Sequence, residues 1–212
     1  MNPKELSFDQ EGRDKLLSGI TKISKAVKST LGPLGKTVLI ESPNHTGGIT
    51  ITKDGVTVAK SIDLEDPAEN LAISMMKEAA DRTATSAGDG TTTAIVLAEA
   101  IVKEGMQLIQ RNPEINTTQL IRDIKVISDN AIKELDLSSK KVTGKTLQHV
   151  ASISANNDSV IGKMIANAYK ELGKDGILTV ENSKTDKTYY EVTKGIKIDR
   201  GYSSKLFINN HR

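Results

Sequence analysis

The sequence predicts a mainly α protein with small β elements. Three observations lead to this fold class. Apolar residues recur every three or four positions over much of the chain, glycine and proline mark the ends of these stretches, and alternating patterns typical of strands are confined to short runs. A chain of 212 residues is long enough for one to two domains and for a sizeable core.

The first expected helix covers Glu11–Leu31, because Leu, Ile and Val recur there at spacings of three and four and a Gly-Pro pair follows. Two short runs, Thr37–Glu41 and Ile49–Lys53, flank a loop rich in Pro, Asn and Gly and are expected to pair as a small hairpin. The next run, Val56–Ala59, alternates like a strand but is too short to distinguish a strand from a helix.

Three further helices are expected in the first part of the chain. One covers Pro67–Ser86, where proline suits the first turn, and one covers Thr91–Ile109. Thr117 or Thr118 is expected to cap another helix over Gln119–Leu135. The apolar positions expected to face inward on this last helix are Ile121, Ile124, Ile127, Ala131 and Leu135.

The composition becomes polar and loses its apolar period after Leu137, so residues 138–145 are interpreted as a domain boundary. The second unit is expected to begin with a helix at Thr146–Ser152 and to contain an amphipathic helix at Val160–Leu172. A capped turn, Ile153–Asp158, separates the two helices. The strand candidates that follow are Ile177–Glu181 and Thr188–Thr193.

The composition excludes several functional classes. The 29 basic and 27 acidic residues give a net charge of +2, and no Lys/Arg cluster is interleaved with aromatic residues, so no nucleic-acid partner is expected. The absence of cysteine excludes a disulfide framework and thiolate metal sites and fits a reducing compartment. Met1–Gln10 lacks an apolar signal core, and no stretch approaches the ~18 apolar residues of a membrane span. We therefore expect a soluble intracellular protein without a membrane partner.

The most informative stretch is Ala87–Ala94, which has the sequence Ala-Gly-Asp-Gly-Thr-Thr-Thr-Ala and leads into an apolar helical run. A helix start offers backbone N–H groups without an intrahelical partner and the positive end of the helix dipole, so it stabilises an anion. Flanking glycines let the backbone approach a ligand closely. Threonine hydroxyls can donate to phosphate oxygens, and Asp89 supplies the oxygen that Mg²⁺ prefers. The pattern therefore predicts a phosphate and Mg²⁺ site at a helix N-terminus.

A structural interpretation of this stretch stays open beside the functional one. Asp89 or one of the threonines can serve simply as the N-cap of the helix, since Asp and Thr are common capping residues. The long run of small and polar residues favours the phosphate site, because a cap requires only one of them.

Five motifs occur in order along the chain: Thr30–Pro33, Ile51–Val58, Ala87–Thr93, Ile153–Asn156 and Asp199–Tyr202. Together they resemble the N-terminal part of group I chaperonins of the GroEL type, and the resemblance extends over essentially the whole chain. It implies an equatorial ATP-binding domain, a helical bundle, over residues 1–137. It further implies an α/β intermediate domain over 138–194 and the beginning of an apical domain over 195–212.

The resemblance also implies a function. Members of this family are ATP-dependent molecular chaperones, so we expect a subunit that assembles with identical copies into seven-membered rings, single or double, and assists the folding and refolding of non-native proteins. The expected activity is a chaperonin ATPase, an isomerase-type activity with ATP and Mg²⁺ as cofactors and K⁺ as a further candidate. A lid co-chaperonin is an expected partner. The expected location is the cytoplasm of a bacterium or of a virus-infected host, or an organelle matrix after removal of a targeting segment.

The resemblance assigns roles to individual residues. The implied nucleotide-binding positions are Thr30, Leu31, Gly32, Pro33, Lys53, Asp89, Gly90, Thr91, Thr92, Thr93 and Ile153. The first four resemble the loop that wraps the phosphates, and Asp89 corresponds to the Mg²⁺ ligand. Asp54 matches a carboxylate near the γ-phosphate that assists hydrolysis, and Ile153 is similar to a residue that packs near the base. These roles agree with the chemistry of phosphoryl transfer, which needs mainly positioned donors and a metal ion.

The main catalytic aspartate of the family and its remaining adenine and ribose contacts belong to a later part of the chain than this sequence contains. We therefore expect an incomplete ATP site within these 212 residues. Gly195 resembles the hinge between the intermediate and apical domains, where a residue without Cβ can absorb a large backbone rotation. The residues that resemble client-binding positions are Tyr202, Leu206 and Phe207.

Two other functions remain as alternatives. The first is a truncated fragment that acts as a structural or binding module and does not hydrolyse ATP. The second is a metabolic kinase or phosphatase built on the glycine and threonine turn, which would need a base and a substrate pocket that the sequence does not reveal. ATP hydrolysis stimulated by non-native protein would distinguish a chaperone from a kinase, since a kinase responds to a small acceptor.

Overall fold

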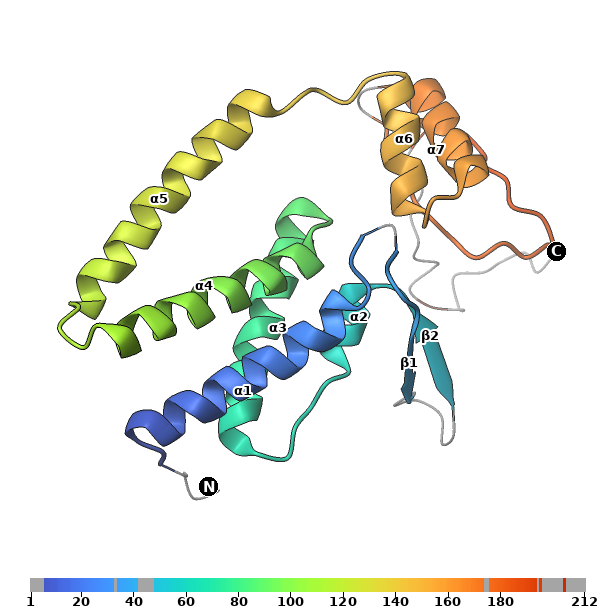
Figure 1. Ribbon diagram of the computed structural model, residues 1–212. Helices are drawn as coiled ribbons and strands as arrows, with labels where there is room; N and C mark the ends of the chain where they lie inside the picture. The colour runs from blue at the N-terminus through green and yellow to red at the C-terminus, as the bar shows by residue number, and fades with distance from the viewer. Residues whose placement is uncertain are drawn as a thin grey trace. The chain divides into compact units, whose positions relative to one another are not determined.

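The computed structural model describes residues 6–32, 34–41, 48–173, 176–193, 195 and 204. Helices predominate in these residues (Figure 1), which confirms the predicted fold class. The elements are α1 (Asp9–Lys28), β1 (Val38–Glu41), β2 (Ile49–Thr52), α2 (Gly55–Lys60), α3 (Pro67–Ala87), α4 (Thr91–Arg111), α5 (Thr117–Ser138), α6 (Lys145–Ser154) and α7 (Ser159–Leu172). The chain forms two compact units, Met1–Val126 and Ile127–Arg212. The three-domain division at residues 137 and 194 stays a prediction.

Helix α1 is the common partner in the first unit and packs against α2, α3 and α4 (Figure 1). A cluster of buried apolar side chains joins these four helices. It consists of Ile23, Val27, Val58, Ala59, Ile73, Met76, Ala80 and Ile95. Each fully buried Ile or Val side chain contributes about 1.5–3 kcal/mol to folding. The cluster therefore determines how the ends of the four helices lie relative to one another.

Local signals place the start of α3 where the sequence predicted it. Asp66 accepts hydrogen bonds from the amides of Ala68 and Glu69 at 2.9 and 3.1 Å, and Pro67 occupies the first turn. Helix α1 ends at Lys28, before the predicted end at Leu31. The amides that follow Lys28 bond to carbonyls three residues back, and this tighter pattern turns the chain out of the helix.

The predicted hairpin is confirmed. Strands β1 and β2 pair antiparallel, with Leu39 opposite Ile51. Val38 and Ile40 point to one face and pack against the buried cluster of the first unit. Leu39, Ile49 and Ile51 lie on the other face and are exposed. The alternation of a strand therefore gives this small sheet one face that faces the core and one apolar face that does not.

The short run Val56–Ala59, whose pattern fitted either a strand or a helix, belongs to helix α2. Asp54 caps this helix by accepting hydrogen bonds from the amides of Val56 and Thr57. Val58 and Ala59 are buried against the other helices of the first unit. Four residues are too few to show a clear hydrophobic period. The cap and the burial of the run therefore determine that it is helical.

Helix α5 differs from its prediction in two respects. The side chain that caps it is that of Asn116, which accepts a hydrogen bond from the Gln119 amide at 3.1 Å, whereas Thr117 and Thr118 lie inside the helix. The prediction that its apolar side faces inward is also wrong for the described part of the chain. No α5 residue is buried, and Ile127 is 68% exposed. The amphipathic period is present, but no described element packs extensively along the helix.

The second unit contains a pair of packed helices, α6 and α7 (Figure 1). Asp158 caps α7 through the amides of Val160 and Ile161, at 2.8 and 3.0 Å, which confirms a capped turn before this helix. The strands predicted at Ile177–Glu181 and Thr188–Thr193 are wrong, because residues 176–193 form no strand. A strand requires a hydrogen-bonded neighbour, and no described segment supplies one.

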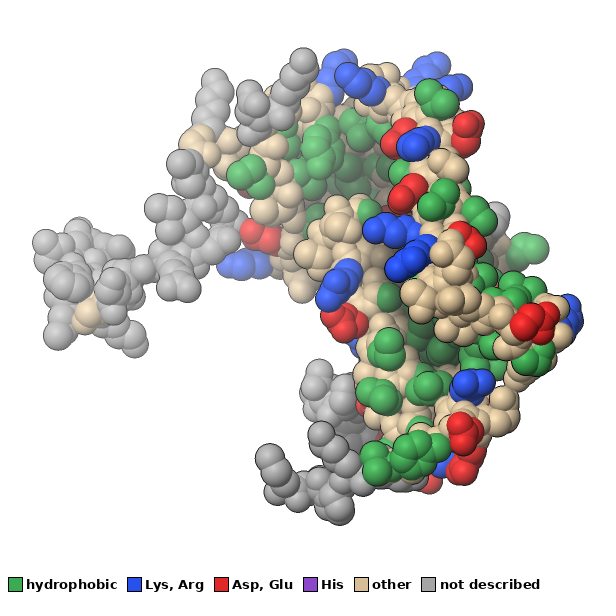
Figure 2. Space-filling model, turned by 90° about the vertical axis from the view of Figure 1, so that its left-hand side faces the viewer, with side chains coloured by type: hydrophobic (Ala, Val, Ile, Leu, Met, Phe, Trp, Pro, Cys, Tyr) green, Lys and Arg blue, Asp and Glu red, His purple; other side chains and the backbone are tan. Residues whose placement is uncertain are grey.

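Many apolar side chains lie at the surface (Figure 2). They occur on both units, for example Met75 on α3, Leu97 on α4 and Leu135 on α5. No helix among the described residues has both the length and the apolar character needed to cross a membrane. Every buried side-chain nitrogen or oxygen in the described residues has a hydrogen-bond partner.

Gly19→Ala is expected to destabilise the first unit. A Cβ atom at position 19 would lie 2.4 Å from the backbone oxygen of Glu69, so α1 and α3 would have to move apart. Such overpacking costs about 1–3 kcal/mol, and we expect a loss of this size in the free energy of unfolding from urea denaturation. The matched control is Gly105→Ala in α4, where nothing lies within 4 Å of the new Cβ and alanine favours the helix. Equal destabilisation by both substitutions would contradict the packing argument.

Candidate functional site

Helices α2 and α4 begin next to each other at one end of the first unit, beside the last turn of α1 (Figure 1). The closest approach is at Gly55, the first residue of α2. A Cβ atom on Gly55 would lie 2.0 Å from Oγ1 of Thr92 and 3.3 Å from Cγ1 of Val27. A real Cβ atom does not approach an oxygen this closely, so any larger residue at position 55 would force the Thr92 side chain to move. Two helix N-termini therefore lie together at the end of α1.

The turn before α4 has the backbone conformation that its glycines predicted. Gly88 and Gly90 have φ angles of 75° and 82°, in the left-handed region. Asp89 between them is exposed, and its Oδ1 atom accepts a hydrogen bond from the Gly90 amide at 2.6 Å. Gly90 is the N-cap of α4, and no side chain caps this helix. The interpretation of Asp89 or a threonine as a mere cap is therefore wrong.

The uncapped start of α4 leaves polar groups that a ligand can use. The first amides of a helix have no intrahelical acceptor, and here no side-chain cap supplies one. The three threonines of this turn are graded in exposure: Thr91 is buried, Thr92 is half-buried and Thr93 is exposed. An anion at this position would accept hydrogen bonds from the amides and interact with the positive end of the α4 dipole.

Asp54 lies at the start of α2, directly before Gly55. One of its carboxylate oxygens accepts a hydrogen bond from the Val56 amide at 3.3 Å, and the other accepts bonds from the Thr57 amide and hydroxyl at 3.0 and 2.6 Å. Partial burial alone would raise the pKa of Asp54, but these hydrogen bonds and the charge of Lys60 outweigh it and lower the pKa. The carboxylate is therefore ionised at neutral pH. It is suited to attracting a cation or orienting a water molecule.

The predicted phosphate loop follows α1 directly. The Thr30 hydroxyl donates a hydrogen bond to the Val27 carbonyl at 2.8 Å, and the Lys36 amide donates to the Ser29 carbonyl at 2.7 Å. The second bond brings Ser29 and Lys36, which flank the loop, close together. Gly32 has a φ angle of 75° and no atom within 4 Å of a Cβ built on it, so its backbone is accessible.

The structure places the other predicted site residues as follows. Leu31 is exposed in the phosphate loop, and Lys53 is exposed between β2 and α2. Ile153 lies on α6 in the second unit and is 65% exposed. Gly195 has a φ angle of 117°, which favours glycine. The positions outside the described residues are Pro33, Tyr202, Leu206 and Phe207.

A metal ion at this site would need phosphate oxygens of a bound ligand in addition to protein carboxylates. In the described part of the chain, no group of three or more His, Asp or Glu side chains could hold a metal ion by itself. Mg²⁺ usually takes one or two protein carboxylates and completes its shell with water and phosphate oxygens. Asp89 fits this role because it is exposed beside the uncapped start of α4. The donor set is therefore consistent with Mg²⁺ that arrives with a phosphate.

Sequence reasoning missed two residues of this site, Gly55 and Thr57. It included Gly55 in the motif Ile51–Val58 without a role of its own, although the residue makes a close contact between α2 and α4. It assigned no role to Thr57, whose hydroxyl bonds to the Asp54 carboxylate. The signal that could have identified them is the spacing Asp-Gly-x-Thr, in which an aspartate caps a helix and bonds back to the third residue after it.

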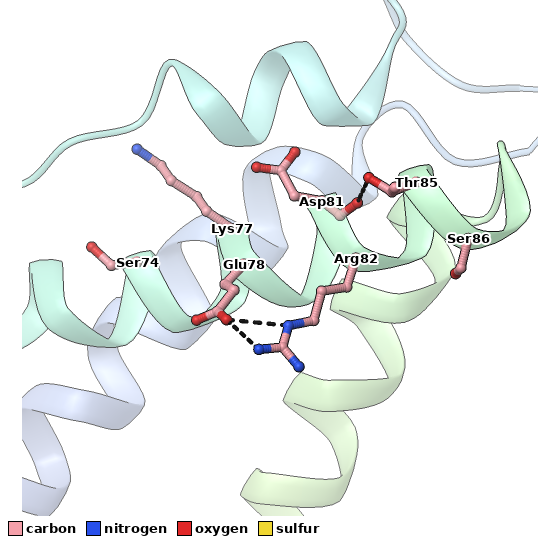
Figure 3. Close-up of a pocket in the computed structure, with 7 residues that line it drawn as sticks. All are labelled: Ser74, Lys77, Glu78, Asp81, Arg82, Thr85 and Ser86. Carbon is pink, nitrogen blue, oxygen red and sulfur yellow. Dashed lines mark hydrogen bonds and ion pairs between the residues drawn. The ribbon is translucent and has the colours of Figure 1, made fainter.

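A shallow surface depression lies elsewhere in the first unit, along α3 (Figure 3). Its charged side chains are already paired with one another or with neighbouring segments. Arg82 bonds to Glu78 at 2.6 Å, as Figure 3 shows, and Asp81 pairs with Lys60 at 2.8 Å. The remaining lining residues are Ser74, Lys77, Thr85 and Ser86. With its charges neutralised and all its residues on one helix, this depression is a weaker candidate than the meeting point of α2 and α4.

A model of the TCP-1/cpn60 chaperonin family matches residues 23–211, which include every segment of the candidate site. Two solved structures of the chaperonin gp146 from the bacteriophage EL 2 (Pseudomonas aeruginosa), both in the presence of ATP-BeFx, are also similar to this chain. Crystal form II is 30% identical, with a TM-score of 0.65, over 76% of this chain and 28% of that chain. Crystal form I is 29% identical, with a TM-score of 0.64, over 77% and 28%. The chain thus spans 28% of the length of these relatives.

Gly55→Ala is expected to cost more in the unmodified chain than in a Thr92→Ala background. The new Cβ meets Oγ1 of Thr92 at 2.0 Å, and Thr92→Ala removes that oxygen. A double-mutant cycle of free energies of unfolding should therefore give a favourable coupling of about 1 kcal/mol between the two substitutions. Additivity of the two effects would contradict the close approach of α2 to α4.

Asp54→Asn is expected to change the pH dependence of stability. The pKa of Asp54 is lowered in the folded state, so the charged carboxylate stabilises the fold above its unfolded-state pKa and this contribution is lost as pH falls through the folded-state pKa. Asparagine keeps a neutral cap. The melting temperature of the wild-type chain should exceed that of the variant at neutral pH, and the difference should vanish in strong acid. Asp14→Asn, on an exposed part of α1, is the control for net charge, and a difference independent of pH would contradict the assignment.

Proposed function

Because the chain belongs to the TCP-1/cpn60 chaperonin family, we propose that it is part of an ATP-dependent chaperone subunit whose nucleotide site lies where α2 and α4 begin. The observation that carries this proposal is the meeting of two helix N-termini at Gly55, one of them without a side-chain cap and next to Asp89. Such an arrangement suits a polyphosphate, because the first amides of α4 and the positive end of its dipole act on one anionic group.

In this proposal the nucleotide phosphates occupy the uncapped start of α4. The amides and hydroxyls of Thr91–Thr93, together with Gly90, donate hydrogen bonds to phosphate oxygens. Asp89 holds Mg²⁺, which neutralises charge that develops on the phosphates during hydrolysis. The Thr30–Pro33 loop and Lys53 cover the phosphates from the end of α1 and from the start of α2.

Asp54 assists hydrolysis through its charge. Its lowered pKa makes it a poor proton acceptor at neutral pH, but Oδ1 accepts only one hydrogen bond from the described residues and each carboxylate oxygen has about two acceptor sites. The remaining site can orient a water molecule or bind a cation such as K⁺. The proposal places Ile153 beside the base and leaves the main catalytic aspartate to a part of the protein outside this sequence.

The family also supports the proposal that identical subunits form rings, seven-membered in the group I pattern, that enclose non-native proteins with the help of a lid co-chaperonin. Gly195 would act as the hinge of the apical domain, since its φ angle of 117° suits only glycine. Tyr202, Leu206 and Phe207 would contact the client. We place this activity in the cytoplasm.

Asp89→Ala in the full natural protein is expected to abolish ATP turnover and to leave the far-UV circular dichroism signal largely unchanged. The reason is that Asp89 is exposed and caps no helix, so its loss removes the Mg²⁺ ligand and little of the fold. Asp14→Ala, at an exposed position of α1, is the matched control and should retain turnover. Unchanged turnover in the Asp89 variant would contradict the assignment.

The same assay distinguishes the alternative functions. Turnover that rises when an unfolded protein is added supports the chaperone, whereas turnover that rises only with a small acceptor supports a kinase. Nucleotide binding without turnover in the full natural protein supports a binding module.

A further inference from the structure

A buried carboxylate outside the proposed nucleotide contacts joins α1 to α4. Glu99, on α4, accepts a hydrogen bond from the Ser24 hydroxyl at 2.6 Å and pairs with the Lys28 ammonium group at 2.5 Å, both through Oε2. The Glu99 side chain is 8% exposed, and Ser24 is fully buried. Lys103, one turn further along α4, is a second cation near this carboxylate.

The position of this cluster along the chain connects two parts of the proposed site. Lys28 is the last residue of α1, directly before the Thr30–Pro33 loop. Glu99 lies about 12 Å along α4 from Thr91, the residue at which the threonine turn enters the helix. The Glu99 carboxylate therefore connects the end of α1, which leads into the loop that begins at Thr30, to α4, which begins at the threonine turn.

The bonds of Glu99 hold it in its ionised form. Burial alone would raise its pKa, but the hydrogen bonds from Lys28 and Ser24 and the charges of Lys28 and Lys103 outweigh burial and lower the pKa. A buried carboxylate with these partners tolerates little displacement, because moving it away from either partner leaves a desolvated charge or hydroxyl without compensation. The cluster is thus a stiff and directional contact, unlike the apolar packing around it.

We infer that Glu99 is a positioning residue for nucleotide binding: with Ser24 and Lys28 it fixes the separation between residues Thr30–Gly32 and the start of α4. This inference rests on the proposed function. It adds a residue, Glu99, that supports nucleotide binding without touching the nucleotide. A displacement of about 1 Å in a catalytic site can lower the reaction rate by about 100-fold, even when its cause is remote. Loosening the Glu99 contact is therefore expected to weaken nucleotide binding although Glu99 does not touch the nucleotide.

The test measures ATP and ADP affinity of the full natural protein by isothermal titration, with hydrogen exchange of the nucleotide-free protein as a second readout. Glu99→Ala is expected to raise both dissociation constants on the order of tenfold and to speed amide exchange at the loop after α1 and at the start of α4 together. Glu99→Gln keeps an oxygen that accepts from Ser24 and Lys28, so it is expected to bind nucleotide within about threefold of wild type.

Two controls separate positioning from a loss of stability. Leu64→Ala shortens a partly buried side chain on the connection between α2 and α3 and lowers the melting temperature without altering the contacts of Glu99 with Ser24 and Lys28, so nucleotide affinity should not change. Glu104→Gln makes the same chemical change as Glu99→Gln at an exposed position of α4 and should have no effect. The double variant Lys28→Ala, Glu99→Ala should bind nucleotide no more weakly than Glu99→Ala alone, since the two substitutions break the same ion pair.

The outcomes distinguish this inference from the proposed function. If the wild-type protein binds no ATP, the proposed function fails and the inference fails with it. If wild type binds ATP and Glu99→Ala binds equally well, only the inference is overturned. Equal weakening of nucleotide binding by Leu64→Ala and Glu99→Ala at the same loss of melting temperature, or additive effects in the double variant, would also overturn it. Should Glu99→Ala fail to fold, Ser24→Ala replaces it, because that variant keeps the ion pair and is expected to weaken binding to a smaller extent.

Discussion

The absence of a side chain at Gly55 is the constraint on which the candidate site depends. A methyl group there would meet Oγ1 of Thr92 at 2.0 Å and lie 3.3 Å from Cγ1 of Val27, so the side chains at this point of contact would have to shift. With glycine, the starts of these helices lie together at the end of α1, and the buried residues Val27 and Val58 hold them in place. The arrangement combines a rigid apolar core with amides that have no side-chain cap. Such a combination lets a protein hold an anion without a large rearrangement.

Two aspartates near this point illustrate why geometry has to decide between capping and binding. Asp54 and Asp89 each precede a helix and are each followed by glycine. Asp54 bonds to the amides of its helix and to a hydroxyl, and these bonds lower its pKa. Among the described residues, Asp89 bonds to the Gly90 amide alone, at 2.6 Å, and leaves the start of α4 uncapped. The first therefore stabilises its helix as an ionised cap, whereas the second is more accessible to a ligand.

The misassigned segments share a physical cause. Val56–Ala59 is too short to show a period, and its capping by Asp54 and burial against α1 make it helical. The runs Ile177–Glu181 and Thr188–Thr193 have the composition of strands, but a strand forms only when a neighbour completes its hydrogen bonds. No segment in the described part of the chain pairs with residues 176–193. In α5 the predicted helix is present, whereas the burial of its apolar side depended on packing that a sequence period does not specify.

The sequence by itself determined the longer helices, the hairpin, the glycine turn before α4 and the family, because these follow from periodicity, capping residues and local motifs. It also located Asp89 and the threonines, since a helix N-terminus is a local feature. Only the tertiary structure brought Gly55 to Thr92 and buried Glu99 between Ser24 and Lys28. These contacts join residues far apart in the chain, and which distant side chains meet is decided by how the helices pack around a common core.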